Sequence, residues 1–587
     1  MRPGHNAEVS AERARWYAPM ALAQVPRLLS MLDREAASVS SGNFDRENWG
    51  WKFRDFPLGM LQTAVYPLAL VWRHALAGNP YHRNARLLDW IVASIEHTLG
   101  RQHRNGAFDA FCPNEQEPGV TVGVMHGLAE AYRVLAPELP ENLVRRLLES
   151  MRRAFAFALP RDESHAFISN HQALFAVGYL DAHELIGEPR CRERAERIVA
   201  RILEHQSTEG WFLEYEGADP GYESLGIQHL AVYWQRTNSP AVLEALRRSV
   251  EFYAHCVHPD GSVGGCYGSR QTGLYFPAGF ELISAEIPQA AAIAAHQRER
   301  MARHSMVTPE SADSENLVPL LGSYLEACLA PGTGLTAQHP PLPCRAMTGT
   351  RRFQKSGLVF AAGSRYYGVM NLRRGGVCRI FDKQEEKLAY EDAGYVLAGR
   401  GVKWTSQALG MSRPEPAGEA ARDATSALFT ELRQELLSPW KFVLLRLLNL
   451  TLFRSLAAGA WLRRLIVRRL VLKKQPGPFR LRRSVQWGEK EIRFHDEIER
   501  LTGMRPESVA LPRSLTSIHM GSAKYFHASE LDDLPAPDLR PVAAALHRER
   551  TAKLEFSITF PAAGAPRLLQ GELTAEHHAH SREAVVT

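Results

Sequence analysis

The stretch STEGWF, Ser207–Phe212, places a glycine between polar residues and an aromatic pair, directly after a helical segment. Similar stretches occur as HRNGAF at 103–108 and as HPDGSV at 258–263. Their glycines, at 106, 210 and 261, are separated by 104 and 51 residues, close to two periods and one period of about 52 residues. A period of this length suits one helical hairpin with its loops. The repeat therefore predicts stacked helical hairpins.

The chain around these loops is helical in pattern up to about residue 330. FPLGMLQTAVYPLALVWRHAL (56–76), for example, carries apolar residues at helical spacing. After about Phe353, short segments such as YYGVMNL (366–372) and KLEFSITF (553–560) are rich in β-branched and aromatic residues and alternate with turns, which is typical of antiparallel sheets. Between the two parts lies a segment rich in proline and glycine. We therefore expect a helical domain at 1–335, a linker at 336–350 and a β-sandwich domain at 351–587.

The charge of the chain is unevenly distributed. Residues 436–488 contain twelve basic and no acidic residues, whereas the whole chain has a formal net charge of +6, so the remainder is near −6 (6 − 12). The basicity is local, and we expect no nucleic-acid partner. We expect the segment at about 438–475 to be a basic, apolar helical insert in the β-sandwich domain. Its arginines leave no apolar stretch long enough for a transmembrane helix. Two interpretations stay open: the segment 440–474 lies on an anionic membrane surface, or it packs on the sandwich with its arginines in water.

The first residues contain no apolar signal-peptide core, and the seven cysteines show no tight pairing pattern. We therefore expect a protein of the cytoplasm, either free or attached peripherally to the inner membrane. The stretch HCVHPDGSVGGC (255–266) brings two histidines and two cysteines together, but the spacing is explained equally well by packing at a helix end. We expect no metal and no cofactor.

Three loops of the helical part, at 41–57, 208–230 and 260–281, combine aromatic rings with charged groups. A carbohydrate site requires this combination, because flat rings contact sugar faces and fixed donors bind hydroxyl or carboxylate groups. Packing at helix ends is the alternative explanation for any single residue. The residues that we expect to bind substrate are Trp49, Trp51, Lys52, Arg54, Trp211, Glu214, Tyr267 and Tyr275. Arg270 in the third loop has the chemistry to hold a carboxylate through a bidentate pair, although it could equally bridge two loops.

The stretch FISNHQALFAVGYL (167–180) carries an adjacent amide and imidazole, Asn170 and His171, in an apolar helical run. Tyr222 follows Asn170 after 52 residues in a glycine-rich loop. This combination, with the domain order, resembles the heparinase II/III-like polysaccharide lyases. The resemblance implies an incomplete (α/α) toroid of helical hairpins followed by an antiparallel β-sandwich. It also implies an acidic polysaccharide or oligosaccharide as partner. The 52-residue step from Asn170 to Tyr222 matches the period of the hairpins, so we expect these residues at equivalent places in successive hairpins, on a shared face.

The resemblance implies a reaction as well, the β-elimination of a uronic-acid-containing glycan. Asn170 and His171 would neutralise the uronate carboxylate, because donors to its oxygens stabilise the charge that develops when the neighbouring carbon loses a proton. Tyr222 would be the general base and general acid. To these residues we add Arg270 as a catalytic residue, not from the resemblance but because its guanidinium can hold a carboxylate. The chain departs from the family in having no histidine between His339 and His495, where relatives commonly supply a second catalytic histidine from the sandwich.

Three hypotheses follow from these residues. The first is a polysaccharide lyase linked to bacterial surface-polysaccharide metabolism. The second is a glycoside hydrolase on the same toroid, with a carboxylate pair from the same loops. The third is a non-catalytic, membrane-associated factor in polysaccharide biosynthesis. The carboxylates available to the hydrolase are Asp45, Asp55, Glu214, Glu216, Asp219 and Glu223.

Overall fold

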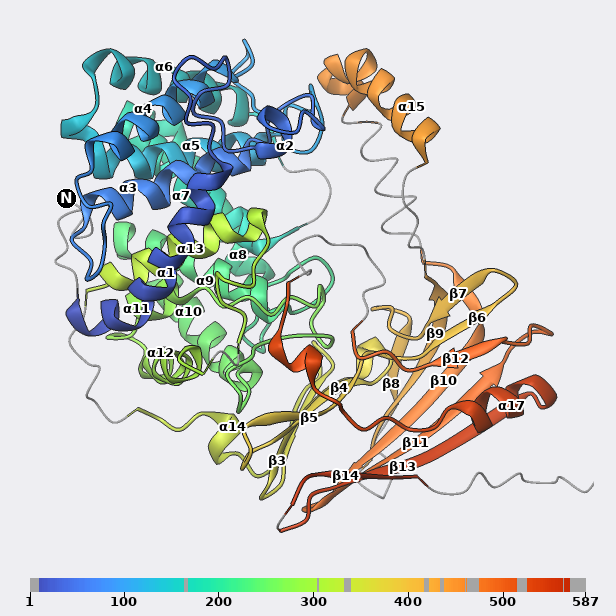
Figure 1. The fold of residues 1–587 in the computed structure, drawn as a ribbon. Coiled ribbons are helices and arrows are strands. Elements are labelled where there is room, and N and C mark those ends of the chain that lie inside the picture. Colours follow the sequence, from blue (N-terminus) through green and yellow to red (C-terminus); the bar gives the residue numbers. More distant parts are fainter. Residues whose placement is uncertain are drawn as a thin grey trace, which may run out of the picture. The chain divides into compact units, whose positions relative to one another are not determined.

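A computed structural model of the 587-residue chain describes residues 10–162, 167–303, 306–331, 339–415, 422–432, 438–459, 461, 474–514, 525–562 and 564–570. The chain forms two compact units (Figure 1). The helical unit comprises Met1–Met347, Gln434–Lys473 and Ile518–Asp532, and the β unit comprises the remaining three segments. The linker expected at 336–350 begins outside the described residues, and the expected domain limits stay a prediction.

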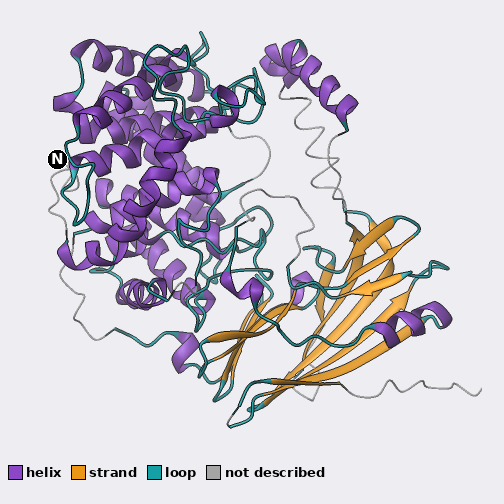
Figure 2. Ribbon diagram, in the orientation of Figure 1, coloured by secondary structure: helices purple, strands orange, loops and turns teal. Residues whose placement is uncertain are grey.

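The helical unit is built from helices joined by loops (Figure 2), and the contacts divide its longer helices into an inner and an outer set. The inner helices contact one another in order, and the last of them contacts the first, so that they form a ring. They are α3 (Val65–Arg73), α5 (Pro118–Leu135), α7 (Ser169–Ile186), α9 (Pro220–Thr237), α11 (Pro277–Leu282) and α13 (Ser314–Leu329). The outer helices are α1 (Ala11–Met31), α4 (Ala85–Gly100), α6 (Glu141–Ala158), α8 (Pro189–His205), α10 (Pro240–Tyr253) and α12 (Pro288–Met301). Shorter elements are α2 (Arg46–Trp49), α14 (Pro343–Ala346) and the 3₁₀ helices η1 (Met60–Ala64), η2 (Ala136–Glu138) and η3 (Ala254–Cys256).

Local sequence explains where the inner helices begin. Pro118 and Pro220 open α5 and α9, and proline suits the first helical turn because its missing N–H needs no partner there. The side chains of Glu117 and Asp219 cap these two helices by accepting hydrogen bonds from backbone N–H groups of the first turn. Because α7 and α9 begin 51 residues apart, His171 and Tyr222 occupy the same position in successive inner helices.

The repeated glycines occupy equivalent turns. Gly106 and Gly210 have φ angles of 95° and 104°, a region that residues with a side chain rarely adopt. A Cβ atom at either position would lie 2.2 Å from the carbonyl oxygen of Arg153 or Arg248, respectively. Each glycine therefore lets its loop pass close to an outer helix. Stacked hairpins, predicted from these glycines, are confirmed.

The β unit contains two antiparallel sheets. The first has the order β1 (Gly349–Phe353), β2 (Leu358–Ala362), β3 (Tyr366–Asn371), β4 (Val377–Asp382), β5 (Lys387–Asp392). The second has the order β12 (Ser508–Ala510), β6 (Val396–Gly399), β7 (Val402–Thr405), β9 (Asp423–Glu431), β10 (Pro476–Trp487), β11 (Glu491–Arg500), β13 (Thr551–Thr559), β14 (Arg567–Gln570), with β8 (Ser412–Glu415) paired to β9. The unit also holds α17 (Arg540–Arg548) and η4 (Leu372–Arg374).

One hydrophobic core joins the two sheets of this unit. Met370 and Ile380 of the first sheet share it with Val485 and Phe494 of the second. The aromatic rings of Tyr390 and Phe494 meet with their centroids 5.8 Å apart. The fold class, an (α/α) toroid of helical hairpins followed by antiparallel β-sheets, is therefore confirmed.

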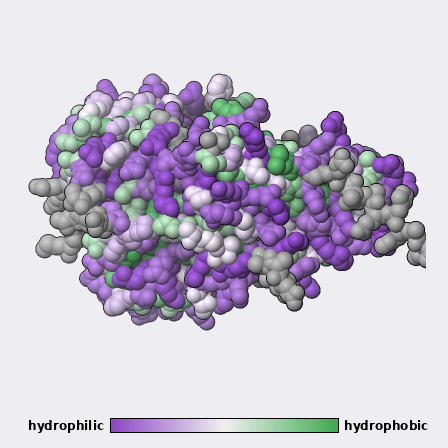
Figure 3. Space-filling view, turned by 90° about the horizontal axis from the view of Figure 1, so that it is seen from below, coloured by the Kyte–Doolittle hydropathy of each residue, from purple (hydrophilic) through white to green (hydrophobic). Residues whose placement is uncertain are grey.

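Part of the basic insert is described as α15 (Pro439–Leu450) and η5 (Leu452–Arg454). Although it lies between β9 and β10 in sequence, α15 belongs to the helical unit, where Arg446 forms an ion pair with Asp55. Among the described helices, none is both long and apolar enough to cross a membrane. The face shown in Figure 3 is mostly hydrophilic, with hydrophobic residues in small groups.

Candidate functional site

A pocket of about 340 Å³ lies within the ring of inner helices. All six inner helices contribute to its wall, so the closure of the ring creates it. The polar residues that line it are Thr63, Tyr66, His74, His126, Glu130, Asn170, His171, Tyr222, Gln228, His229, Gln235, Arg236, Ser323 and Glu326. Apolar residues such as Leu174, Leu225 and Val318 fill the wall between them.

Three of the predicted catalytic residues line this pocket together. Asn170 and His171 belong to the first turn of α7, and Tyr222 belongs to the first turn of the neighbouring helix α9. His171 and Tyr222 are partly exposed, whereas most of Asn170 is buried. The first turn of a helix presents unpaired N–H groups and a partial positive charge, which favour a bound anion. The arrangement can therefore receive a carboxylate beside a phenol.

Glu214 fixes the orientation of Asn170. Its carboxyl oxygens accept hydrogen bonds from the backbone N–H of Asn170 at 2.8 Å and from the side-chain amide of Asn170 at 2.7 Å. Glu214 is fully buried, and burial raises its pKa to about 8, although the bonds from Asn170 partly oppose this shift. The structure thus places Glu214, predicted to bind substrate, behind Asn170 and out of reach of solvent. Its carboxyl supports the amide instead.

Two further acidic residues of the same loop are also buried supports. Asp219 accepts hydrogen bonds from the backbone N–H groups of Tyr222 and Arg270, at 3.4 and 2.7 Å. Glu223 accepts one from the hydroxyl of Ser249 at 2.8 Å, and burial raises the pKa of Glu223 well above its usual value. These carboxyls hold the start of α9 in place and are not accessible to a substrate.

Arg270 lies outside the pocket wall, contrary to its predicted place beside Asn170 and Tyr222. Its guanidinium carbon lies 3.4 Å from the centre of the Tyr215 ring, a cation–π contact. Only a small part of Arg270 is exposed. The structure therefore places Arg270 between two loops, which is the alternative that the sequence left open.

The predicted aromatic contacts of the second and third loops are also interior. Tyr267 and Tyr275 are fully buried, and the hydroxyl of Tyr267 lies 2.9 Å from Nε2 of His258. Trp211 is buried and donates its indole N–H to Glu209 at 3.0 Å. A buried ring cannot stack on a sugar, so these three residues stabilise the loops in this conformation. Burial also raises the pKa of Tyr275 well above its usual value.

The first loop lies on the surface of the helical unit, outside the pocket wall. Trp49 donates its indole N–H to the carbonyl oxygen of Met31 at 2.8 Å, and Arg54 forms ion pairs with Asp45 and Glu47 at 2.6 and 2.7 Å. Trp51 and Lys52 are exposed. In this loop, Trp51 and Lys52 are therefore the predicted binding residues that solvent reaches most readily.

Sequence reasoning missed the histidines of the pocket. His126 of α5 and His229 of α9 lie edge to face with their ring centroids 6.1 Å apart. Burial, together with the neighbouring His126 and His171, lowers the pKa of His229 to about 3. A signal did exist in the sequence, because Tyr222, His229 and Arg236 follow at intervals of seven residues and so share one face of a helix.

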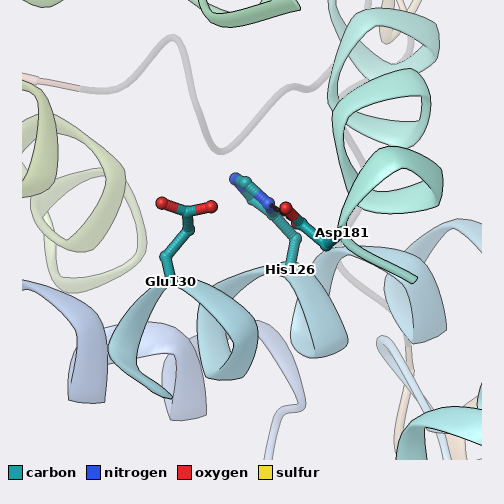
Figure 4. A group of neighbouring side chains, drawn as sticks. All are labelled: His126, Glu130 and Asp181. Atoms are coloured by element: carbon teal, nitrogen blue, oxygen red, sulfur yellow. Dashed lines mark hydrogen bonds and ion pairs between the residues drawn. The ribbon is translucent and has the colours of Figure 1, made fainter. Parts of the chain in front are cut away.

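His126 is held by a buried carboxylate. Its Nδ1 lies 2.6 Å from Asp181 of α7 (Figure 4). Asp181 also pairs with Arg236 at 2.8 Å and with Arg133 at 3.1 Å. Burial opposes ionisation of Asp181, but Arg236, His126 and Arg133 outweigh it and lower the pKa of Asp181. An ionised Asp181 places the proton on Nδ1 of His126 and so fixes its tautomer. The imidazole can then exchange a proton at Nε2.

His126, Glu130 and Asp181 also have the donor types of a cation site, since one ligand atom from each lies within 4.8 Å of the others. Figure 4 shows His126 and Glu130 on α5, with Asp181 meeting the histidine from α7. Both oxygens of Asp181 already have cationic or N–H partners, and two guanidinium groups balance its charge. A cation would have to displace these partners, so the group is better described as an ion-pair network.

Comparison with known proteins adds one family match. Residues 58–274, which include Asn170, His171, Tyr222 and Arg270, match the family model of the ulvan lyase N-terminal domain. The chain matches no curated protein by sequence. The resemblance to polysaccharide lyases is therefore confirmed over this part of the helical unit.

Solved structures with a similar fold include three lyases. A xanthan lyase from Paenibacillus is 10% identical, with a TM-score of 0.46 over 84% of this chain and 45% of that one. A chondroitin AC lyase from Streptomyces coelicolor is 12% identical, with a TM-score of 0.47 over 85% and 68%. A heparan sulfate lyase from Pedobacter heparinus is 10% identical, with a TM-score of 0.42 over 82% and 69%. This chain thus spans less than half the length of the xanthan lyase.

Proposed function

We propose that this protein is a polysaccharide lyase that cleaves a uronic-acid-containing glycan by β-elimination. The observation that carries the proposal is the meeting of Asn170, His171 and Tyr222 in one pocket, from the first turns of two neighbouring inner helices. The family match over residues 58–274 supports it independently of this geometry.

The reaction begins with the loss of the proton on C5, next to the uronate carboxylate. The amide of Asn170 and the imidazole of His171 donate to the carboxylate oxygens and so stabilise the negative charge that develops there. The phenolate oxygen of Tyr222 accepts the C5 proton. The C4–O bond then breaks, a C4=C5 double bond forms, and the phenol of Tyr222 returns the proton to the leaving oxygen.

Glu214 acts in this proposal as a positioning residue. One N–H of the Asn170 amide is directed to Glu214, so the second N–H is oriented for the substrate carboxylate. Since a misplacement of about 1 Å costs on the order of a hundredfold in rate, a fixed amide is more effective than a mobile one. His126, held by Asp181, is a second group in the pocket that can move a proton.

The hydrolase alternative has less support. It needs two carboxyl groups that reach the substrate. Asp45, Glu214, Asp219 and Glu223 are buried, and Asp55 is paired with Arg446. The carboxylates that do line the pocket are Glu130 and Glu326, and Glu326 already accepts hydrogen bonds from Tyr66 and Gln228.

The direct test is the ultraviolet absorbance of the unsaturated uronate that β-elimination produces. Ulvan, chondroitin, heparan sulfate, xanthan and polyuronates are incubated with the full chain. We expect absorbance to rise with at least one of them, and Tyr222→Phe to lower the rate at least about a hundredfold, because general acid–base catalysis supplies a factor of about 10² to 10⁴.

Tyr66→Phe is the matched control, since Tyr66 is a tyrosine of the same pocket contributed by α3. It should keep most of the activity. Full activity of Tyr222→Phe would make the assignment of the base wrong, and His126→Asn would then be the variant to examine. Reducing ends without absorbance would instead indicate hydrolysis. If no glycan yields a product, the lyase proposal is wrong, and the hypothesis of a non-catalytic factor in polysaccharide biosynthesis at the cytoplasmic membrane takes its place.

A further inference from the structure

Helix α15 turns its polar side toward the protein. Arg446 pairs with Asp55 at 2.9 Å and lies over the ring of Phe56 at 5.6 Å. Asn449, three residues later, is buried, and its carbonyl oxygen accepts a hydrogen bond from the Asn114 amide at 3.3 Å. The side chain of Arg446 and the backbone carbonyl of Asn449 thus attach the helix to the loops before η1 and α5.

The opposite side of α15 is apolar and faces solvent. Trp440, Leu444 and Leu447 are 82%, 59% and 56% exposed, and Val443 and Leu450 on the same side are also exposed. These five positions follow at intervals of one or three residues and gather on one side, so they form one stripe along the helix. A surface helix normally buries such a stripe and exposes its polar side, and α15 does the reverse.

The loops that hold α15 also carry exposed apolar residues. Phe53 lies two residues before Asp55, which pairs with α15, and is 84% exposed. Phe111 lies three residues before Asn114, which bonds to the same helix, and is 77% exposed. An exposed apolar stripe such as that of α15 usually marks a contact with a membrane or a protein.

The charge of the surrounding sequence favours a membrane. Residues 440–474 contain nine basic and no acidic residues. Lipid phosphates would attract these cations, while Leu, Val and Trp side chains would enter the boundary between headgroups and acyl chains. Leu and Val offer no flat ring for a sugar, so the stripe does not suit the glycan. The twelve residues of α15 span about 18 Å, too short to cross a bilayer, so the helix would lie in its surface.

We propose that α15 docks the helical unit on an anionic membrane surface, with the stripe formed by Trp440, Val443, Leu444, Leu447 and Leu450 inserted between the lipids. The Arg446–Asp55 pair transmits this attachment to the loop that leads into η1, whose residue Met60 lines the pocket. The membrane would thus hold the pocket near membrane-attached polysaccharide. The docking itself does not depend on the proposed lyase activity.

The test is sedimentation of the full chain with vesicles of phosphatidylcholine alone and of phosphatidylcholine mixed with phosphatidylglycerol. We expect binding to the mixed vesicles, weakened by salt because part of the attraction is electrostatic. Leu444→Glu should lower the affinity at least about tenfold, since it removes an inserted side chain and adds a negative charge. Trp440 fluorescence should shift to shorter wavelength when the mixed vesicles are added.

Val39→Glu is the matched control, because Val39 is a fully exposed apolar residue outside α15 and the charge change is the same. It should bind as the parent chain does, and both variants should keep the parent's unfolding temperature. Equal binding of Leu444→Glu and the parent chain, or no binding to the mixed vesicles, would overturn the proposal. Lipid-free self-association that Leu444→Glu abolishes would assign the stripe to a second copy of the chain instead.

Discussion

At the scale of single residues, the site depends on a buried carboxyl beneath an amide. Glu214 has no contact with solvent, yet it positions Asn170 through two hydrogen bonds. An acid in this environment is held partly in its neutral form, because burial penalises the charge. The sequence LEYEGADP suggested substrate contacts by its acids and aromatics, but composition does not distinguish a carboxyl that faces a ligand from one that faces the backbone.

This environment predicts a pH dependence of stability. The Glu214 carboxyl has a pKa of about 8 in the folded protein against a usual value of 4.5, so between these values the folded state holds a proton that the unfolded state has lost. Folding is therefore destabilised as pH rises, by up to about 1.4 kcal/mol for each pH unit. Glu214→Gln cannot ionise, and we expect its free energy of unfolding to fall less between pH 5 and pH 8 than that of the parent chain.

Chemical denaturation across this pH range measures the effect. Glu216→Gln is the control, since Glu216 lies two residues away and is exposed. It should follow the parent chain at every pH. Identical pH slopes for Glu214→Gln and the parent chain would show that Glu214 does not titrate as its burial implies.

At the scale of the elements, the glycine turns and the inner helices form one repeating unit. The turn at Gly210 lets the chain pass close to α10, where the carbonyl of Arg248 occupies the space of a Cβ atom. The helix that follows then places Tyr222 at the position that His171 holds in the preceding hairpin. The repeat seen in the sequence therefore has a packing cause.

Gly210→Ala should destabilise the helical unit for two reasons. The left-handed backbone costs a residue with a side chain about 1 to 2 kcal/mol, and the clash with Arg248 adds about 1 to 3 kcal/mol. Gly187→Ala separates these contributions, because Gly187 has a φ angle of 69° but no neighbouring atom within 4 Å of the place that a Cβ would take. Thermal unfolding should show a clearly larger loss for Gly210→Ala, and equal losses would contradict the close approach.

At the scale of the whole molecule, each of the two units has buried charges of its own. In the β unit, Arg483 is fully buried, and its guanidinium donates to Asp496 at 2.7 and 2.8 Å and to Asp392. The helical unit has its own network around Asp181. Removing one partner of such a group leaves a carboxylate buried without its counter-charge, which lowers the stability of the folded state.

Arg483→Met should therefore lower the stability of the β unit by about 3 to 5 kcal/mol. Arg482→Met is the control, because Arg482 is the adjacent residue of β10 but is exposed and pairs with Glu497 at 3.3 Å. Calorimetry of the full chain should show one transition moved by Arg483→Met and another moved by Gly210→Ala. A single transition moved equally by both variants would show that the two units unfold together.

The sequence by itself determined the features that repeat along the chain. Helical periodicity, the change to short β segments after about residue 353, and the spacing that puts His171 and Tyr222 at equivalent helix positions can all be found there, because each depends on residues close together in the chain. Only the tertiary structure decided which side chains meet. Closure of the inner ring brings His126 and His229 into the pocket, while loop packing buries Tyr267 and Tyr275 and draws Arg270 onto Tyr215. These outcomes depend on contacts between residues far apart in sequence, which no local pattern records.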